Sequence, residues 1–217
     1  MKRWFAVIAV ALVLAACHRP VRPDLTAPLP TSVEDLTAAI AADSSRSERE
    51  PDASIRDQLA ADALRHADAC IAHAPQSAAC LYYRAVALGL EAKAHPLRAG
   101  ELLKSMLESL TSADAVDPEF DQAGPSRVRA LVLMRAPGWP LGPGDPDMGL
   151  VAARRAVTLR PQYPPNVLAL AEALAKTGDA MGARDNYVRA HDLAKGLPAS
   201  TDRDDWLRNA AQGLQRN

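Results

Sequence analysis

Apolar positions recur every three to four residues along most of the chain, which is the spacing of one buried helix face. Nowhere do apolar and polar residues alternate with the period of two that a half-buried strand requires. The pattern therefore predicts an all-α protein with helices over residues 32–43, 52–73, 77–94, 97–115, 127–134, 147–159, 164–176, 180–195 and 202–215. Residues 44–51 are polar and charged and are predicted to form a loop.

The clearest pair of predicted helices lies in residues 164–197. Gly178 and Asp179 occupy the turn between the two helices of this pair. Glycine adopts the left-handed conformation that ends a helix, and an aspartate side chain caps the first turn of the next one. This segment is therefore predicted to be a two-helix unit.

Three residues of the second helix in this unit, Ala183, Tyr187 and Ala190, follow at i, i+4 and i+7 and share one face. Small residues at this spacing let neighbouring helices approach closely. We therefore expect the three side chains to pack between repeat helices rather than to contact a ligand. The same register, ended by a proline, recurs earlier in the chain as Gly149, Ala153, Ala156 and Pro161, and as Ala63, Ala67, Cys70 and Pro75.

This register resembles that of the tetratricopeptide repeat (TPR), whose second helix carries small, aromatic and small residues and whose period is about 34 residues. The prolines at positions 75, 118 and 161 are 43 residues apart, which predicts repeats lengthened by long helices or inserted loops. The resemblance implies a TPR-like solenoid of antiparallel helix pairs, and a generic helical bundle is the alternative. The usual Trp or Tyr near the start of the first helix is missing from residues 164–197.

A segment rich in proline and glycine interrupts the helical pattern at residues 136–147, which contain four prolines and three glycines. No helix persists at that density, so we predict an inserted loop between two helices of one repeat. Asp145 and Pro146 suit the cap and first position of the helix that follows. Trp139 in this insert has two interpretations: a ring docked against the solenoid, which we favour because exposed tryptophans are uncommon, or an exposed contact for a partner or ligand.

The insert, with the repeat-like helix and the Arg160-Pro161 pair after it, is similar to a segment of TPR lipoproteins. These include the periplasmic T-component family associated with TRAP transporters, and the similarity covers roughly residues 125–195. It implies an all-helical periplasmic protein with a concavity that a ligand can enter. It places none of that family's functional residues on this chain.

The first 17 residues have the pattern of a cleaved export signal. Lys2 and Arg3 precede an apolar run at residues 5–14, which is shorter than the roughly 20 residues needed to span a bilayer. Residues 14–17, Leu-Ala-Ala-Cys, resemble the lipobox of bacterial lipoproteins. The resemblance implies removal of residues 1–16 and acylation of Cys17 with chains such as palmitate, and His18 in place of Asp favours the outer over the inner membrane. An ordinary secretory signal or an uncleaved helix is the alternative.

Residues 17–31 contain four prolines and no apolar periodicity, which predicts a semi-extended tether in front of a helical domain at residues 32–217. The chain has 25 Lys and Arg against 26 Asp and Glu, and loss of Lys2 and Arg3 leaves a net charge of −3. This balance excludes the strong electrostatic attraction on which nucleic-acid binding depends. We expect the acyl chains alone to hold the protein at the membrane.

Residues suited to chemistry form no catalytic or metal-binding pattern in the sequence. His66 and His73 are seven residues apart on one predicted helix, but a metal site needs at least a third ligand, and neither His-x3-His nor Cys-x2-Cys occurs. A Gly-x-Ser-x-Gly elbow and a phosphate-binding glycine loop are missing as well. We therefore predict no enzyme, no cofactor and no metal, and two solvated histidines.

Cys70 and Cys80 lie five residues on either side of Pro75, at the end of one predicted helix and the start of the next. Positions equidistant from the turn of an antiparallel hairpin tend to face each other. The oxidising periplasm permits a disulfide if the two Cα atoms come within about 7 Å. Two buried free thiols are the alternative, because the spacing does not determine the directions of the Cβ atoms.

Two functions from different classes follow from these patterns. The first is a lipid-anchored periplasmic module that binds or assembles an envelope protein through the concave surface of a solenoid. The alternative is a small-molecule-binding accessory subunit of a TRAP-type uptake system, with an enclosed apolar pocket lidded by the insert. The sequence does not name the partner or the ligand.

Overall fold

The computed structural model describes residues 28–216, and the elements in this range are all helices. Cys17 and most of the expected tether lie outside the described residues. In chain order the elements are α1 (Val33–Arg49), α2 (Ala53–His73), α3 (Ala78–Ala94), the short 3-10 helix η1 (Pro96–Arg98), α4 (Ala99–Val116), α5 (Phe120–Arg135), α6 (Pro146–Leu159), α7 (Pro164–Lys176), α8 (Ala180–Lys195) and α9 (Thr201–Arg216). The predicted all-α class is confirmed.

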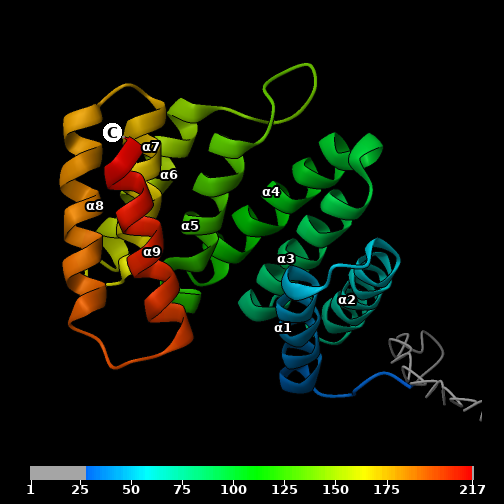
Figure 1. Ribbon diagram of the computed structural model, residues 1–217. Coiled ribbons are helices and arrows are strands. Elements are labelled where there is room, and N and C mark those ends of the chain that lie inside the picture. The colour runs from blue at the N-terminus through cyan, green and yellow to red at the C-terminus, as the bar shows by residue number, and fades with distance from the viewer. Residues whose placement is uncertain (1–27, 217) are drawn as a thin grey trace, which may run out of the picture.

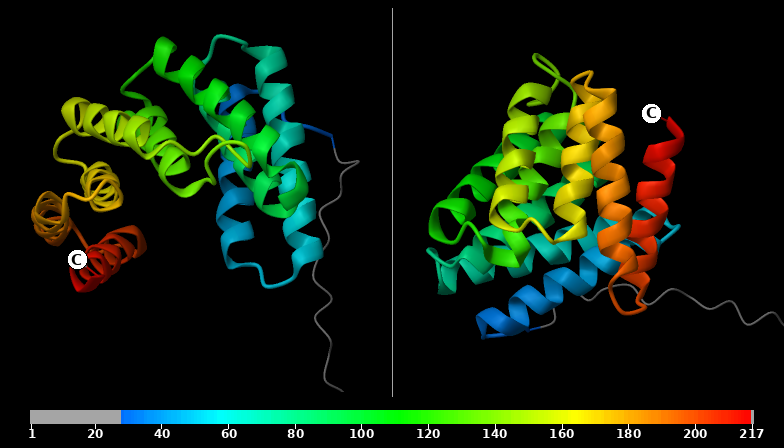
Figure 2. Two further views of the ribbon diagram at one scale, coloured as in Figure 1. Left: turned by 90° about the horizontal axis from the view of Figure 1, so that it is seen from above. Right: turned by 90° about the vertical axis from the view of Figure 1, so that its left-hand side faces the viewer.

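The helices pack as consecutive pairs, α1 with α2, α3 with α4, α5 with α6 and α7 with α8, and α9 packs against α8 and α7. Figures 1 and 2 show these pairs side by side in a curved array, with α1 and α2 at one end and α8 and α9 at the other. The first helix of each pair also contacts the first helix of the next pair, whereas the second helices do not contact one another within the described residues. The array therefore curves with the first helices on its inner, concave face.

Small residues let the paired helices approach closely. A Cβ atom at Gly149 of α6 would lie 2.8 Å from Met134 Cγ of α5, so α5 and α6 leave no room for a side chain there. A Cβ atom at Gly213 of α9 would overlap the ring of Tyr187 on α8. The residues of the predicted register are all buried: Ala63, Ala67, Cys70, Gly149, Ala153, Ala156, Ala183, Tyr187 and Ala190.

The second helix of the second pair, α4, has the same register with larger residues, Met106, Leu110 and Ala113, all of which are buried. Counted from Ala67 through Leu110 and Ala153 to Tyr187, the spacing between repeats is 43, 43 and 34 residues. Long helices and η1 lengthen the first interval, and the insert at residues 136–145 lengthens the second. Only the last interval has the ordinary TPR period.

The predicted turn and cap residues occupy the expected positions. Gly178 has a φ of +92°, and the Asp179 side chain accepts a hydrogen bond from Gly182 N at 2.9 Å. Asp145 caps α6 by accepting from Met148 N at 3.0 Å, with Pro146 at the first helical position. These local predictions are confirmed because both caps depend only on neighbouring residues.

The predicted loop at residues 44–51 is wrong, because α1 continues to Arg49. This polar segment stays helical because α1 packs against both α2 and α3, and Ser44 and Ser47 are half-buried. Arg46 and Arg49 in the last turn also interact favourably with the negative end of the helix dipole. Packing against α2 and α3 thus extends α1 through residues 44–49, whose polar composition alone does not favour a helix.

The predicted solvated state of His66 is also wrong, whereas His73 is exposed. The His66 side chain is only 14% exposed, and its Nδ1 lies 3.5 Å from Asp43 Oδ2 on α1. Burial raises the pKa of Asp43 above its ordinary value, and the nearby His66 opposes that shift. His66 therefore belongs to the contact between α1 and α2.

The start of α5 contains a left-handed turn that the sequence pattern did not predict. Asp121, Gln122 and Ala123 have φ values of 48°, 57° and 63°, which non-glycine residues rarely adopt. Gly124 and Pro125 follow, and the regular part of α5 begins there. The turn directs the backbone carbonyl of Gln122 toward α7, where the buried Asn166 side chain donates a hydrogen bond to it.

Candidate functional site: the concave groove

The inner face of the array contains a groove with two halves. One hollow, of about 660 Å³, lies between α5, α7 and α9, and a second, of about 510 Å³, lies between α1, α3, α4 and α5. Leu131 and Arg135 of α5 line both hollows, so the two hollows meet at α5. We call the first hollow the polar half and the second hollow the apolar half of the groove.

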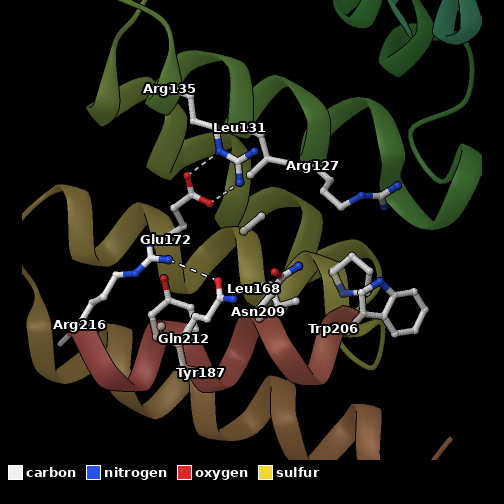
Figure 3. Close-up of a pocket in the computed structure, with 13 residues that line it drawn as sticks. Arg127, Leu131, Arg135, Leu168, Glu172, Tyr187, Trp206, Asn209, Gln212 and Arg216 are labelled. Carbon is white, nitrogen blue, oxygen red and sulfur yellow. Dashed lines mark hydrogen bonds and ion pairs between the residues drawn. The ribbon is translucent and has the colours of Figure 1, made fainter. Parts of the chain in front are cut away.

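The polar half is lined by residues of α5, α7, α8 and α9, most of which Figure 3 labels. Its charged side chains are three arginines and one glutamate. The full set is Arg127, Leu131, Arg135, Pro165, Leu168, Ala169, Glu172, Tyr187, Trp206, Asn209, Gln212, Gly213 and Arg216.

An ion pair joins the two walls of the polar half. Arg135 Nε on α5 donates to Glu172 Oε1 on α7 at 2.7 Å, and Arg135 Nη2 donates to Glu172 Oε2 at 2.6 Å (Figure 3). This hydrogen bonding raises the pKa of Arg135. The two-point geometry fixes the orientation of both side chains where the halves of the groove meet.

Tyr187 packs between helices and also lines the groove. Its ring is buried against Ala171, Leu174 and Leu214, as the predicted packing role requires. Its hydroxyl points into the polar half in Figure 3, and burial raises its pKa. The expectation that Tyr187 serves packing alone is therefore too narrow.

The helix α9 supplies the remaining polar groups of this half. Arg216 Nη2 donates to Gln212 Oε1 at 3.3 Å on the groove side of α9. Trp206, near the start of α9, lies edge-on to Tyr163 with ring centroids 5.5 Å apart. No pattern in the sequence marks these residues as part of a site, although Trp206 is one of three tryptophans in the chain.

A buried network beneath the polar half joins three helix pairs. Arg127 of α5 is 8% exposed and donates to Asp121 Oδ2 at 2.7 Å and to Asn166 Oδ1 at 3.2 Å. Tyr82 of α3 donates its hydroxyl to Asp121 Oδ2 at 2.8 Å. The Arg127 guanidinium also lies 5.2 Å from the ring centre of Tyr163. The network thus links α3, α5 and α7 and holds the first helices in place along the groove.

Asn166 is the fully buried member of this network. Its Nδ2 donates to the carbonyl oxygens of Gln122 at 3.0 Å, Ala156 at 3.2 Å and Arg160 at 3.2 Å. The Gln122 carbonyl belongs to the left-handed turn of α5, so this turn supplies a hydrogen-bond acceptor for the buried Asn166 amide, and Asn166 supplies a donor for the turn. No regular sequence pattern marks such a pairing, so it is not predictable from the sequence alone.

The apolar half is lined mainly by aliphatic side chains of α3, α4 and α5. Ser44 and Glu48 of α1 and Lys93 of α3 are its polar rim. The full set is Ser44, Glu48, Val86, Gly89, Leu90, Ala92, Lys93, Ala99, Leu103, Met106, Val128, Leu131, Val132, Arg135, Ala136 and Pro137. The groove as a whole therefore changes from apolar to polar across α5.

The chemistry available in the groove suits binding. Ser44 is the only serine among the residues that line it, and these residues include no histidine or cysteine. A Ser–His or Cys–His pair is therefore missing from this part of the described structure. No three His, Cys, Asp or Glu side chains within residues 28–216 are placed to hold a metal ion.

The other predicted site residues lie outside the groove. Cys70 at the end of α2 and Cys80 at the start of α3 are joined by a disulfide, with Cα atoms 5.4 Å apart. The favoured docked interpretation of Trp139 is wrong: the side chain is 91% exposed because the insert projects beyond the ends of α5 and α6 (Figure 1). No helix among the described residues is long and apolar enough to cross a bilayer.

The likeness to known proteins lies in the fold. No protein-family model and no curated protein matches the sequence significantly. The crystal structure of TTC0263, a thermophilic TPR protein in Thermus thermophilus, is similar with a TM-score of 0.56 and 20% identity, over 84% of this chain and 92% of that chain. The crystal structure of MamA gives a TM-score of 0.48 with 15% identity, over 75% and 90% of the two chains. The described residues therefore have a TPR-like helical-repeat fold.

Proposed function

We propose that the protein is a lipid-anchored module of the cell envelope that binds a partner protein along its concave groove. The observation that carries the proposal is that an apolar hollow and a polar hollow meet at α5 on the inner face. Fold alone does not name a function, whereas the size and chemistry of this surface favour a particular kind of occupant.

The length of the groove favours a polypeptide as the occupant. It runs across α1, α3, α5, α7 and α9, and packed helices lie about 8–10 Å apart, so it extends over about 35 Å. An extended segment of about ten residues covers that length at about 3.3 Å per residue. The apolar half would receive apolar side chains, and the amide, hydroxyl and guanidinium groups of the polar half would bind backbone or polar groups.

Anchoring through Cys17 is part of the same proposal. The lipobox-like residues 14–17 and the proline-rich residues 17–31 support it, together with the position of α1 at one end of the array. The protein would face the periplasm, on the outer membrane more readily than the inner one. It would need no cofactor and no nucleic acid for this role.

Site-specific photocrosslinking tests the groove as the binding surface. A photoreactive residue at Leu131 or Leu168, on the floor of the groove, should crosslink one and the same envelope protein in cells. The same probe at Val151 of α6 or Met181 of α8, both exposed outside the groove, is the matched control and should not. Equal crosslinking from all four positions, or none from Leu131 and Leu168, would contradict the proposal.

A small-molecule-binding role, as in a TRAP-associated subunit, is the second candidate. One observation favours it: the apolar half has a volume of about 510 Å³, within the range of about 300–1,000 Å³ typical of small-molecule sites. Native mass spectrometry of the protein purified from membranes distinguishes the two. A co-purifying small molecule that is lost in Leu131→Arg would support this candidate over a polypeptide.

A further inference from the structure

Three exposed apolar side chains gather at one place outside the groove. Leu97 of η1 is 104% exposed, and Trp139 and Leu141 of the insert are 91% and 78% exposed. All three line one hollow, which also includes the start of α4. The insert lies against α4 there, because a Cβ atom at Gly100 would be 3.1 Å from the carbonyl oxygen of Leu141. We call Leu97, Trp139 and Leu141 the tip.

We propose that the tip enters the boundary between headgroups and acyl chains of a lipid bilayer. This inference goes beyond binding in the groove, and it rests on the proposed function only in placing the protein at a membrane. Tryptophan and leucine are the side chains that favour this boundary, since the indole combines an apolar ring with one polar N–H group. The tip would then act as a second membrane contact that orients the molecule.

The insert is built to present the tip rather than to bury it. Leu141 N donates to Gly138 O at 3.0 Å, and Gly144 N donates to Pro137 O at 2.8 Å. Asp145 N donates to Leu133 O at 2.8 Å, which ties the insert to the end of α5. A loop held in one conformation loses little entropy when its side chains bind.

The backbone of the insert also limits the free-energy cost of transferring the tip from water into lipid. Its three prolines at positions 137, 140 and 143 have no N–H group, and the N–H groups of Leu141, Gly142 and Gly144 are already bonded inside the loop. Unpaired backbone groups are what an apolar phase penalises most. The tip can therefore enter a lipid boundary with few donors left unsatisfied.

The surroundings of the tip favour a lipid surface over a protein surface. Figure 1 shows the insert projecting past the ends of its flanking helices, whereas the groove that suits a polypeptide lies on the inner face. The exposed charged side chains around the tip are of both signs: Arg98 and Lys104 are basic, and Glu101 of α4 and Asp145 at the end of the insert are acidic. Long basic side chains at the boundary between headgroups and acyl chains extend their charged ends toward the phosphate groups.

The length of chain before α1 allows the anchor and the tip to meet one membrane. The start of α1 and the insert lie at opposite edges of Figure 1. The ten residues from position 18 to position 27 lie between Cys17 and the described chain, and if semi-extended they would span about 31 Å at about 3.1 Å per residue. This length is close to that of the longest helix, α2, which has 21 residues and is about 32 Å long. A tether of this length would allow Cys17 and the tip to reach the same bilayer.

Depth-dependent fluorescence quenching on vesicles tests this inference. The chain without residues 1–16 retains every described residue and two tryptophans, Trp139 and Trp206. With Cys70 and Cys80 bridged, Cys17 is the free thiol that couples to a maleimide lipid, which reproduces the expected anchor point without cellular acylation. The vesicles contain brominated phosphatidylcholine with phosphatidylethanolamine and phosphatidylglycerol. Trp206→Phe leaves Trp139 as the probe, and Trp139→Phe leaves Trp206.

We expect the emission of Trp139 to move to shorter wavelength and to lose most of its intensity to the brominated lipid, while Trp206 keeps its intensity. Replacing both leucines of the tip, Leu97→Ser with Leu141→Ser, should restore the Trp139 emission. Met181→Ser, at an exposed methionine of α8 away from the tip, is the matched control and should change nothing.

Two results would overturn the inference: Trp139 quenched no more than Trp206, or quenching of Trp139 that survives the leucine replacements. Failure of the proposed lipid anchor shows separately, as missing acylation of Cys17 in cells, because coupling to vesicles bypasses that step.

Discussion

Asn166 shows how one buried side chain can hold several helices together. Its amide group donates to carbonyl oxygens of Gln122, Ala156 and Arg160, and its carbonyl oxygen accepts from Arg127. These groups belong to the left-handed turn of α5, the end of α6 and the regular part of α5. A residue with four such partners and no exposure has no substitute of the same shape that satisfies them all.

We expect Asn166→Ala to lower the free energy of unfolding by about 3 kcal/mol, because buried polar groups that lose their partner cost about 1–3 kcal/mol each. Urea unfolding followed by circular dichroism measures the change. Asn209→Ala, at an exposed position of α9, is the control and should stay within about 0.5 kcal/mol of the parent. Equal stability of the two variants would refute the structural role of the network.

Tyr187 combines a packed ring with a hydroxyl on the groove. Tyr187→Ala should destabilise the protein by about 3–5 kcal/mol, since truncation of a buried aromatic side chain leaves a cavity. Tyr187→Phe keeps the ring against Gly213 and should unfold close to the parent. The phenylalanine variant should weaken partner crosslinking only if the hydroxyl contacts the bound segment. A parent-like alanine variant would argue against the repeat register.

The hairpin of α2 and α3 illustrates a covalent link between two elements. Cys70 and Cys80 lie ten residues apart in sequence, and Leu36 of α1 packs against both. A disulfide between residues at this separation lowers the entropy of the unfolded chain. In the chain-entropy description this raises the free energy of unfolding by about 2–3 kcal/mol.

Removing both sulfurs, Cys70→Ala with Cys80→Ala, should therefore lower the unfolding midpoint in urea under oxidising conditions. Under reducing conditions the parent should unfold at nearly the same urea concentration as the double variant. Alkylation after unfolding gives the direct measurement: the protein isolated without reductant should show no reactive thiol at either position. Two labelled cysteines would establish the free-thiol alternative instead.

The whole molecule brings together a curved array, a groove on its inner face and a tip at one edge. Each depends on how the pairs stack, because the first helices contact one another along the inner face and the second helices stay apart. A membrane anchor before α1 would set which way this array faces. With the tip in the bilayer boundary, the groove would then lie at a defined height above the membrane.

Acylation is the test of that placement. Cys17→Ala should leave unprocessed precursor or release the protein from the membrane fraction, because the cysteine supplies both the cleavage signal and the thiol that is acylated. Metabolic labelling with an alkyne fatty acid should mark the parent and not the variant. Unchanged fractionation together with unchanged labelling would reject the lipoprotein assignment and leave the groove proposal to its own test.

Local patterns along the chain were enough to predict the all-α class, most helix boundaries and the small residues between repeats. The caps at Gly178, Asp179 and Asp145 depend on neighbours within one helical turn, so their residue types alone reveal them. The register of Ala183, Tyr187 and Ala190 is likewise visible because helical periodicity brings these residues to one face. Such features require no knowledge of which helices meet.

Contacts between distant segments decided everything else. The helical state of residues 44–49, the left-handed turn at residues 121–123 and the burial of His66 each depend on an element that packs against them from elsewhere in the chain. The groove joins α1, α3, α5, α7 and α9, and the exposure of Trp139 follows from an insert that projects past its helices. Helical periodicity specifies which face of a segment is apolar, but the partner of that face, and therefore the surface left open, is determined only when all the helices are packed together.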